Sequence, residues 1–124
     1  MRVFLLALLF CCQLLTAAAA NVPLMPVRDL RAGMQGIGKT VISGDTIETF
    51  NVEILGVNGS EAMGYSIFVR LYGDLIEKTG GVAQGMSGSP VYVDGRLVGA
   101  VAFGKTFNDP HYCFLTPIGK MLPL

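Results

Sequence analysis

Short apolar runs separated by turn residues dominate the chain after its first twenty residues. The runs are rich in β-branched and aromatic side chains and are bounded by Gly, Asp, Asn and Pro, a pattern typical of β-strands. Strands are expected at residues 40–43, 49–57, 65–71, 90–93, 96–103 and 112–115. No segment sustains the period of about 3.6 residues that marks an amphipathic helix. Short helical stretches are expected only at 27–32 and after Pro117.

The clearest hairpin signal is the dipeptide Asp94-Gly95, because apolar residues alternate on both sides of it and the dipeptide favours a two-residue type I′ turn. Further turns are expected at Gly44-Asp45, Asn58-Gly59 and Asn108-Asp109-Pro110. Turns at such spacings are typical of a small all-β barrel or sandwich.

The N-terminus has the three regions of a signal peptide. Met1 and Arg2 form a short positive region, residues 3–15 are apolar, and residues 16–20 are small. We expect a signal peptide at 1–20, cleavage near Ala20-Asn21 and an exported domain at 21–124, placed outside the cytoplasm as a secreted or envelope-associated protein. The alternative is an uncleaved anchor, since about 18 apolar residues approach the length that spans a bilayer.

Charge and cysteine content narrow the function classes. The chain carries nine basic and nine acidic side chains, so a nucleic-acid partner is not expected. Cys11 and Cys12 lie in the leader, which leaves Cys113 as a core thiol without an intrachain disulfide partner. One histidine and one remaining cysteine are too few for a zinc cluster, so neither a metal nor another cofactor is expected.

The candidate chemistry lies in the segment Gly85-Met86-Ser87-Gly88-Ser89-Pro90, directly before the hairpin. A nucleophilic serine needs a tight turn with small neighbours and backbone N–H groups aimed at a developing oxyanion, and Ser87 between glycines meets that need. The alternative is a glycine-rich turn with two incidental serines. Ser89 is the second choice of nucleophile, although a structural hydroxyl explains it equally simply.

This segment resembles the nucleophile loop of the trypsin-like superfamily, and more closely that of the SpoIVB-type peptidases of sporulating bacteria and their relatives. The closer resemblance also includes Thr79-Gly80-Gly81 and the segment from Thr116 to Leu122. Residues 25–27, 33–38 and 50–57 resemble the opening of the same domain, so the likeness runs from about Leu24 to Leu122.

The resemblance implies a small trypsin-like β-barrel with a short helical start at its C-terminus. It further implies a serine endopeptidase that acts on protein or peptide substrates by acyl transfer through Ser87, with the N–H groups of Gly85 and Ser87 forming the oxyanion hole. Because 124 residues are too few for two complete barrels, we expect a single or partial double barrel, or a fragment of a longer peptidase. The alternative function is an inactive domain that binds a peptide or protein and keeps the loop because the fold needs its glycines.

The general base is not assigned by the sequence. In the trypsin-like order a histidine and an aspartate precede the serine. The single histidine of this sequence, His111, instead follows Ser87. His111 is therefore a possible base, a wall of the specificity pocket, or a surface residue. Lys78 and Lys105 are alternatives as bases, without support from spacing. Asp109 is expected to form an Asx turn around Pro110.

The segment from Gly33 to Thr40 fits the phosphate-binding pattern G-x-x-x-x-G-K-[ST]. That site requires a buried strand before the loop and a helix after it. Residues 27–32 are too charged for such a strand, and residues 41–45 are strand-like and then turn. Nucleotide binding is therefore not expected, and the glycines are interpreted as a tight chain reversal before a strand.

Overall fold

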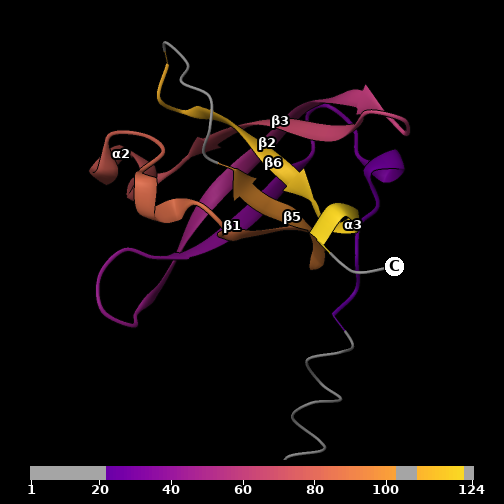
Figure 1. Cartoon of the computed structure of the whole chain (residues 1–124). Coiled ribbons are helices and arrows are strands. Elements are labelled where there is room, and N and C mark those ends of the chain that lie inside the picture. The colour runs from indigo at the N-terminus through magenta and orange to yellow at the C-terminus, as the bar shows by residue number, and fades with distance from the viewer. Residues whose placement is uncertain (1–21, 103–108, 122–124) are drawn as a thin grey trace, which may run out of the picture.

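The computed structural model describes residues 22–102 and 109–121 (Figure 1). The expected signal peptide at 1–20 and the candidate base Lys105 lie outside these residues. The elements in chain order are η1 Val27–Asp29, β1 Gln35–Val41, β2 Ile47–Ser60, β3 Gly64–Tyr72, α2 Asp74–Thr79, η2 Gln84–Met86, β4 Pro90–Val93, β5 Arg96–Ala102, β6 Tyr112–Pro117 and α3 Ile118–Met121.

The six strands form one closed barrel in the order β1-β2-β3-β6-β5-β4, with antiparallel pairing at every seam. The barrel closes between β1 and β4, where Ile37 pairs with Tyr92 and Gly38 with Val91. The helices α2 and α3 lie at opposite ends of the barrel (Figure 1). The expected small all-β barrel is confirmed.

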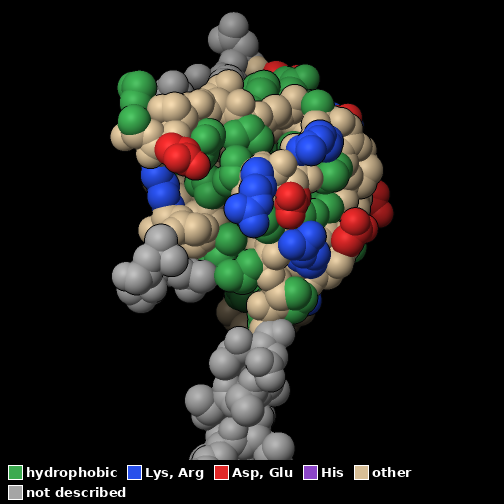
Figure 2. All heavy atoms as spheres, turned by 90° about the vertical axis from the view of Figure 1, so that its right-hand side faces the viewer, with side chains coloured by type: hydrophobic (Ala, Val, Ile, Leu, Met, Phe, Trp, Pro, Cys, Tyr) green, Lys and Arg blue, Asp and Glu red, His purple; other side chains and the backbone are tan. Residues whose placement is uncertain are grey.

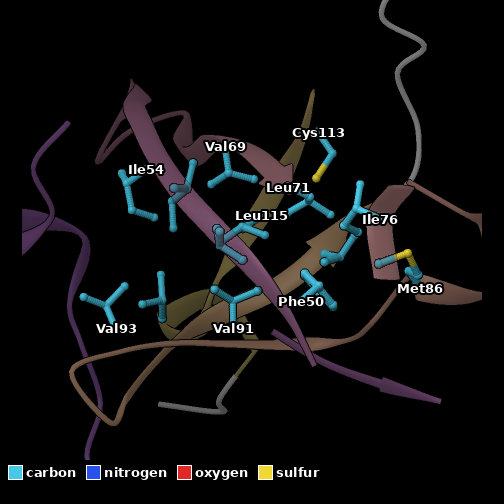
Figure 3. Packing of buried hydrophobic residues seen from close by; sticks show 14 of the residues in the cluster. Phe50, Ile54, Val69, Leu71, Ile76, Met86, Val91, Val93, Cys113 and Leu115 are labelled. Atoms are coloured by element: carbon cyan, nitrogen blue, oxygen red, sulfur yellow. The ribbon is translucent and has the colours of Figure 1, made fainter. Parts of the chain in front are cut away.

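The core fills the barrel interior with aliphatic side chains. Buried and partly exposed positions alternate along β3 and β6, as the two-residue period of a strand requires. Ile54, Ile67, Leu71 and Leu115 are among the fully buried side chains, and Figure 3 shows how the cluster packs. Cys113 is buried in β6 as expected, and burial raises the pKa of its thiol to about 12.

The hairpin at Asp94-Gly95 is confirmed. Asp94 has φ 51° and Gly95 has φ 73°, the two left-handed conformations that a type I′ turn needs. Val93 pairs with Arg96 directly next to the turn. The two strands beside the turn are therefore held in a fixed register immediately after the serine loop.

The turn expected at Asn58-Gly59 is wrong. Strand β2 continues to Ser60, and the chain reverses at residues 61–63. Gly59 lies at the end of the strand pair with φ 112°, and a side chain there would overlap the carbonyl oxygen of Gly64. The glycine thus serves a close approach of two backbones rather than a turn.

The interpretation of residues 33–40 as a chain reversal is only partly right. Gly33, with φ 93°, lies in a turn, but β1 already begins at Gln35 and contains Gly36 and Gly38. A side chain at Gly38 would overlap the ring of Phe50. The strand itself, and not a loop followed by a helix, occupies the phosphate-binding pattern.

The helices are short, and α2 is absent from the sequence expectations. Leu75 and Ile76 bury its inner face, and it ends at Gly80 in the left-handed conformation, φ 76°. Six residues do not display a helical period, which is why only its capping glycine signals it. The stretch expected at 27–32 is the 3₁₀ turn η1, and the expected helical start after Pro117 is α3. None of the helices in residues 22–102 and 109–121 has the length and apolarity needed to cross a membrane.

Gly99→Ala is expected to destabilise the barrel by about 1–3 kcal/mol, because a methyl group there would overlap the carbonyl oxygen of Thr116 on the neighbouring strand. Thermal unfolding measures the effect. Gly56→Ala is the matched control, because a methyl group at this other strand glycine would meet no atom within 4 Å. A melting temperature for Gly99→Ala equal to that of the control would contradict the packing argument.

Candidate functional site

Ser87 lies on a loop that is anchored on both sides. The preceding Met86 is fully buried, and Figure 3 shows it at the same end of the core as Ile76. After Ser87, the N–H of Gly88 donates to the carbonyl of Val101 at 2.8 Å, and the N–H of Val101 donates to the carbonyl of Ser89 at 2.9 Å. Ser87 itself is exposed. Ser87 is therefore the exposed serine of this loop, between the buried Met86 and the two residues that bond to Val101 of β5.

An open cleft of about 490 Å³ surrounds this loop. Its lining consists of the serine loop, the end of β1 and the start of β2 and β4: Lys39, Thr40, Val41, Ile47, Gly85, Ser87, Gly88, Ser89, Pro90 and Tyr92. Ser89 is only 7% exposed. Ser87 is accordingly the more accessible of the two candidate nucleophiles.

The predicted oxyanion donors are the N–H groups of Gly85 and Ser87. The N–H of Ser87 donates to the carbonyl of Gln84 at 3.4 Å, within the 3₁₀ turn η2. Backbone hydrogen bonds in proteins are usually about 2.9–3.0 Å long, so this one is weak. For the N–H of Gly85, the described part of the chain provides no backbone acceptor.

His111 is held between two carboxylates. Its Nδ1 lies 2.7 Å from Oδ1 of Asp109, and its Nε2 lies 3.0 Å from Oε1 of Glu77 in α2. The backbone N–H of His111 also donates to Asp109 at 2.9 Å, which confirms the expected Asx turn. Among the described residues no hydrogen bond joins His111 to Ser87, and the residues lining the Ser87 cleft do not include it. The structure thus leaves the base unassigned.

These contacts shift two pKa values. The hydrogen bond to Asp109, followed by that to Glu77, raises the pKa of His111 above its ordinary value of 6.5. The hydrogen bond from the backbone N–H of His111, and then the one from its ring, lower the pKa of Asp109 below 3.8. Both shifts favour an ion pair, which fixes the turn at 109–111 against α2.

The lysines are distributed differently from the sequence hypothesis. Lys78 lies on α2, is exposed, and is not among the described residues that line the Ser87 cleft. Lys39, which the sequence offered only as part of the phosphate-binding pattern, lines the cleft together with Ser87. Its Nζ lies 5.2 Å from the ring centroid of Tyr92. No local signal links residue 39 to residue 87, because barrel closure brings them together.

Residues 22–102 and 109–121 contain no group of His, Cys, Asp and Glu placed to hold a metal ion. Glu77 and Asp109 contact opposite ring nitrogens of His111 and do not converge on one point. In the phosphate-binding motif, the N-terminus of a helix after the loop binds the phosphate. Here residues 35–41 form a strand instead of a loop that leads into a helix.

A second hollow of about 560 Å³ lies between the N-terminal segment, the start of β3 and α3. Figure 2 shows the side of the molecule with η1 and α3, where hydrophobic side chains lie among Lys, Arg, Asp and Glu side chains. The residues that line this hollow are mostly apolar and include no serine, histidine or cysteine. Among the described residues, Lys120 is the one amine that lines it.

Comparison with known proteins identifies one family. The model of the family described as SpoIVB peptidase S55 matches residues 15–122. This range includes the whole barrel and the serine loop. A search of curated proteins found no match to the chain.

We expect His111 to titrate above its ordinary pKa of 6.5, and Glu77→Gln to bring its pKa closer to 6.5. The raised pKa means that its contribution to stability is fully present below pH 6.5 and is lost as the pH rises through the folded-state pKa. Asp109, with a lowered pKa, contributes above pH 3.8 and loses its contribution only as the pH falls below that value.

The ring-proton resonances of His111, followed by NMR over pH, measure this directly. In thermal unfolding, the difference between the wild type and His111→Gln should narrow as the pH is raised from acidic to alkaline values. A His111 pKa at or below 6.5 would show that Asp109 and Glu77 do not hold the ring as described, an arrangement that we call the clamp on His111.

Proposed function

The chain belongs to the SpoIVB peptidase S55 family, and on this premise we propose that it is an exported serine endopeptidase-like domain with Ser87 as its nucleophile. Its substrates are proteins or peptides. The observation that carries the proposal is the placement of Ser87, exposed in an open cleft on a loop fixed by Met86 and Val101.

In this reaction Oγ of Ser87 attacks the carbonyl carbon of the scissile peptide. A C–O bond forms, the C–N bond breaks, and the hydroxyl proton passes by way of a base to the leaving amine. Water then hydrolyses the acyl-enzyme ester. The negative charge on the carbonyl oxygen requires N–H donors aimed at it, and we assign this role to Gly85 and Ser87.

The N–H of Ser87 must leave the carbonyl of Gln84 to serve as a donor. A backbone hydrogen bond contributes about 0.5–1.5 kcal/mol net, and the 3.4 Å length of this one places it at the weak end. An oxyanion is a stronger acceptor than a carbonyl oxygen, so substrate binding offsets the release.

The second candidate function is a peptide- or protein-binding domain without catalysis. It is favoured by the engagement of both ring nitrogens of His111 with Asp109 and Glu77. A chain whose single histidine is held in this way offers no imidazole to Ser87. The binding cleft is the same in both functions, but only the first requires an activated hydroxyl.

Labelling with a fluorophosphonate tests the choice. We expect the purified chain to form a Ser87 Oγ–P bond with loss of fluoride, which intact mass and peptide mapping detect. Ser87→Ala should abolish the adduct, whereas the neighbouring Ser89→Ala should retain it as long as the variant melts cooperatively. A folded wild-type chain that forms no adduct would exclude the peptidase and leave the binding domain.

Export by the N-terminal segment is part of the same proposal. When the complete chain is expressed in a bacterium, we expect the protein recovered outside the cytoplasm to begin near Asn21, after removal of the apolar leader. Intact mass of the recovered protein gives the cleavage site. Recovery of the unprocessed chain in the cytoplasm would refute export, and unprocessed chain in the membrane fraction would identify an anchor.

A further inference from the structure

A continuous row of side chains crosses four neighbouring strands on the outside of the barrel, with β1 among them. Tyr92 of β4 pairs with Ile37 of β1, Ile37 pairs with Asn51 of β2, and Asn51 pairs with Tyr72 of β3. Paired residues in a sheet point to the same face. Two tyrosines thus flank an isoleucine and an amide on the outside of the barrel.

This row lines a hollow of about 750 Å³ that adjoins the Ser87 cleft. Lys39 and Tyr92 belong to the lining of both, so the two hollows have a common wall. The hydroxyl of Tyr72 bonds to Gln35 at the far side of the outer hollow. The two hollows meet at Lys39 and Tyr92, and we call the pair of them, which extends from Ser87 along β1, the β1 groove.

The apolar side chains of the β1 groove are unusually exposed. Ile37 is 49% exposed, Val41 42% and Ile47 67%, and Val41 pairs with Ile47 beside the Ser87 cleft. Aliphatic side chains gathered at one site on a small domain mark a surface that another molecule covers.

Lys39 supplies the only lysine or arginine side chain that lines the groove in the described part of the chain, at the end shared with the Ser87 cleft, where no described carboxylate lines it. Asp94 lines the other hollow, at the β4–β5 turn. Arg70 is paired with Glu53 and Arg96 with Asp29, whereas Lys39 forms no ion pair with a described carboxylate. Lys39 is exposed, so a ligand side chain can reach it. Its position suits a fixed cation that recognises an anionic side chain.

We infer that the β1 groove binds an extended polypeptide that places an acidic side chain against Lys39, whose Nζ lies over the ring of Tyr92, and an apolar side chain over Ile37. The inference rests on the proposed function of Ser87 and names the substrate class of that site. An extended peptide repeats its side chains on one face about every 6.6 Å, the same spacing that separates Ile37 and Lys39 along β1. Alternate residues of such a peptide therefore meet the apolar and the charged part of the groove in turn.

Binding of fluorescein-labelled octapeptides from a positional-scanning library tests this inference, read by fluorescence polarisation. The measurement uses Ser87→Ala so that no peptide is consumed, and it needs no catalysis. We expect pools with Asp or Glu at one position to bind about 3-fold more tightly than pools with Asn or Gln there, the range of an exposed ion pair. Lys39→Met should remove this preference, and Lys39→Glu should reverse it in favour of Lys or Arg.

Lys120→Glu is the control for a general effect of charge, because Lys120 is exposed on α3 and lines the separate hollow beside the N-terminal segment. It should leave the acidic preference unchanged. Binding without an acidic preference, a preference that survives Lys39→Glu, or the absence of binding by every pool would each overturn the inference. A dimer in analytical ultracentrifugation that Ile37→Asp dissociates would assign the groove to a second copy of the chain and overturn it as well.

The two proposals fail in different ways. A wild-type chain that forms no fluorophosphonate adduct, together with a persistent acidic preference in peptide binding, would refute catalysis and leave the groove intact. Labelling at Ser87 without any effect of Lys39 on peptide binding would leave catalysis intact and refute the groove.

Discussion

Closure of the barrel between β1 and β4 is the constraint on which the site depends. Only two residue pairs form this seam, and it requires close approach of the backbones. A side chain at Gly36 would lie 2.5 Å from the carbonyl oxygen of Tyr92, and one at Gly38 would overlap the ring of Phe50. Gly36 therefore allows β1 and β4 to meet, whereas Gly38 leaves room for the Phe50 ring of β2. The same seam brings Lys39 and Tyr92 beside Ser87, so the cleft exists only in the closed barrel.

The serine loop is attached to the closed barrel by both core packing and backbone hydrogen bonds. Met86 contributes core packing, and Gly88 and Ser89 extend the hydrogen bonding of β5 through Val101. The backbone is thus held on both sides of Ser87, while its side chain faces solvent. Catalysis and tight binding both benefit from a group whose position is fixed before the ligand arrives. The loop is thus explained by either candidate function, and the state of its hydroxyl is what separates them.

Local chemistry in the sequence predicted the local structure well. The Asp94-Gly95 turn, the existence of six strands and the core position of Cys113 follow from residue preferences over a few neighbours. The same reasoning misjudged Gly59. A glycine is needed there because the backbone of Gly64 lies close to it across the hairpin, and not because of its neighbours in the sequence. Helix α2 escaped because six residues are too few to show a period. Prediction therefore failed where an element is short or where its cause lies on another strand.

The site was predictable only in its local part. The glycines around Ser87 marked the loop, but the approach of Lys39 to that loop depends on barrel closure, and the contact of His111 with Glu77 joins residues 34 positions apart. Neither has a signature within a window of sequence. Ionisable groups recruited from distant elements are the part of a site that composition and spacing do not reveal.

The clamp on His111 sets the scale of activity expected of Ser87. A positioned general base contributes about 10²–10⁴-fold to the rate of such a reaction, while an oxyanion hole and binding alone retain about 10³–10⁴-fold over water. With His111 held by Glu77 and Asp109, a catalytic Ser87 would draw the second contribution from the loop itself and would need the first from another group. The rate of Ser87 modification therefore measures the two separately: a rate well above that of the unfolded chain reports the N–H donors, and a rise with pH that levels off at the pKa of a single group reports the base.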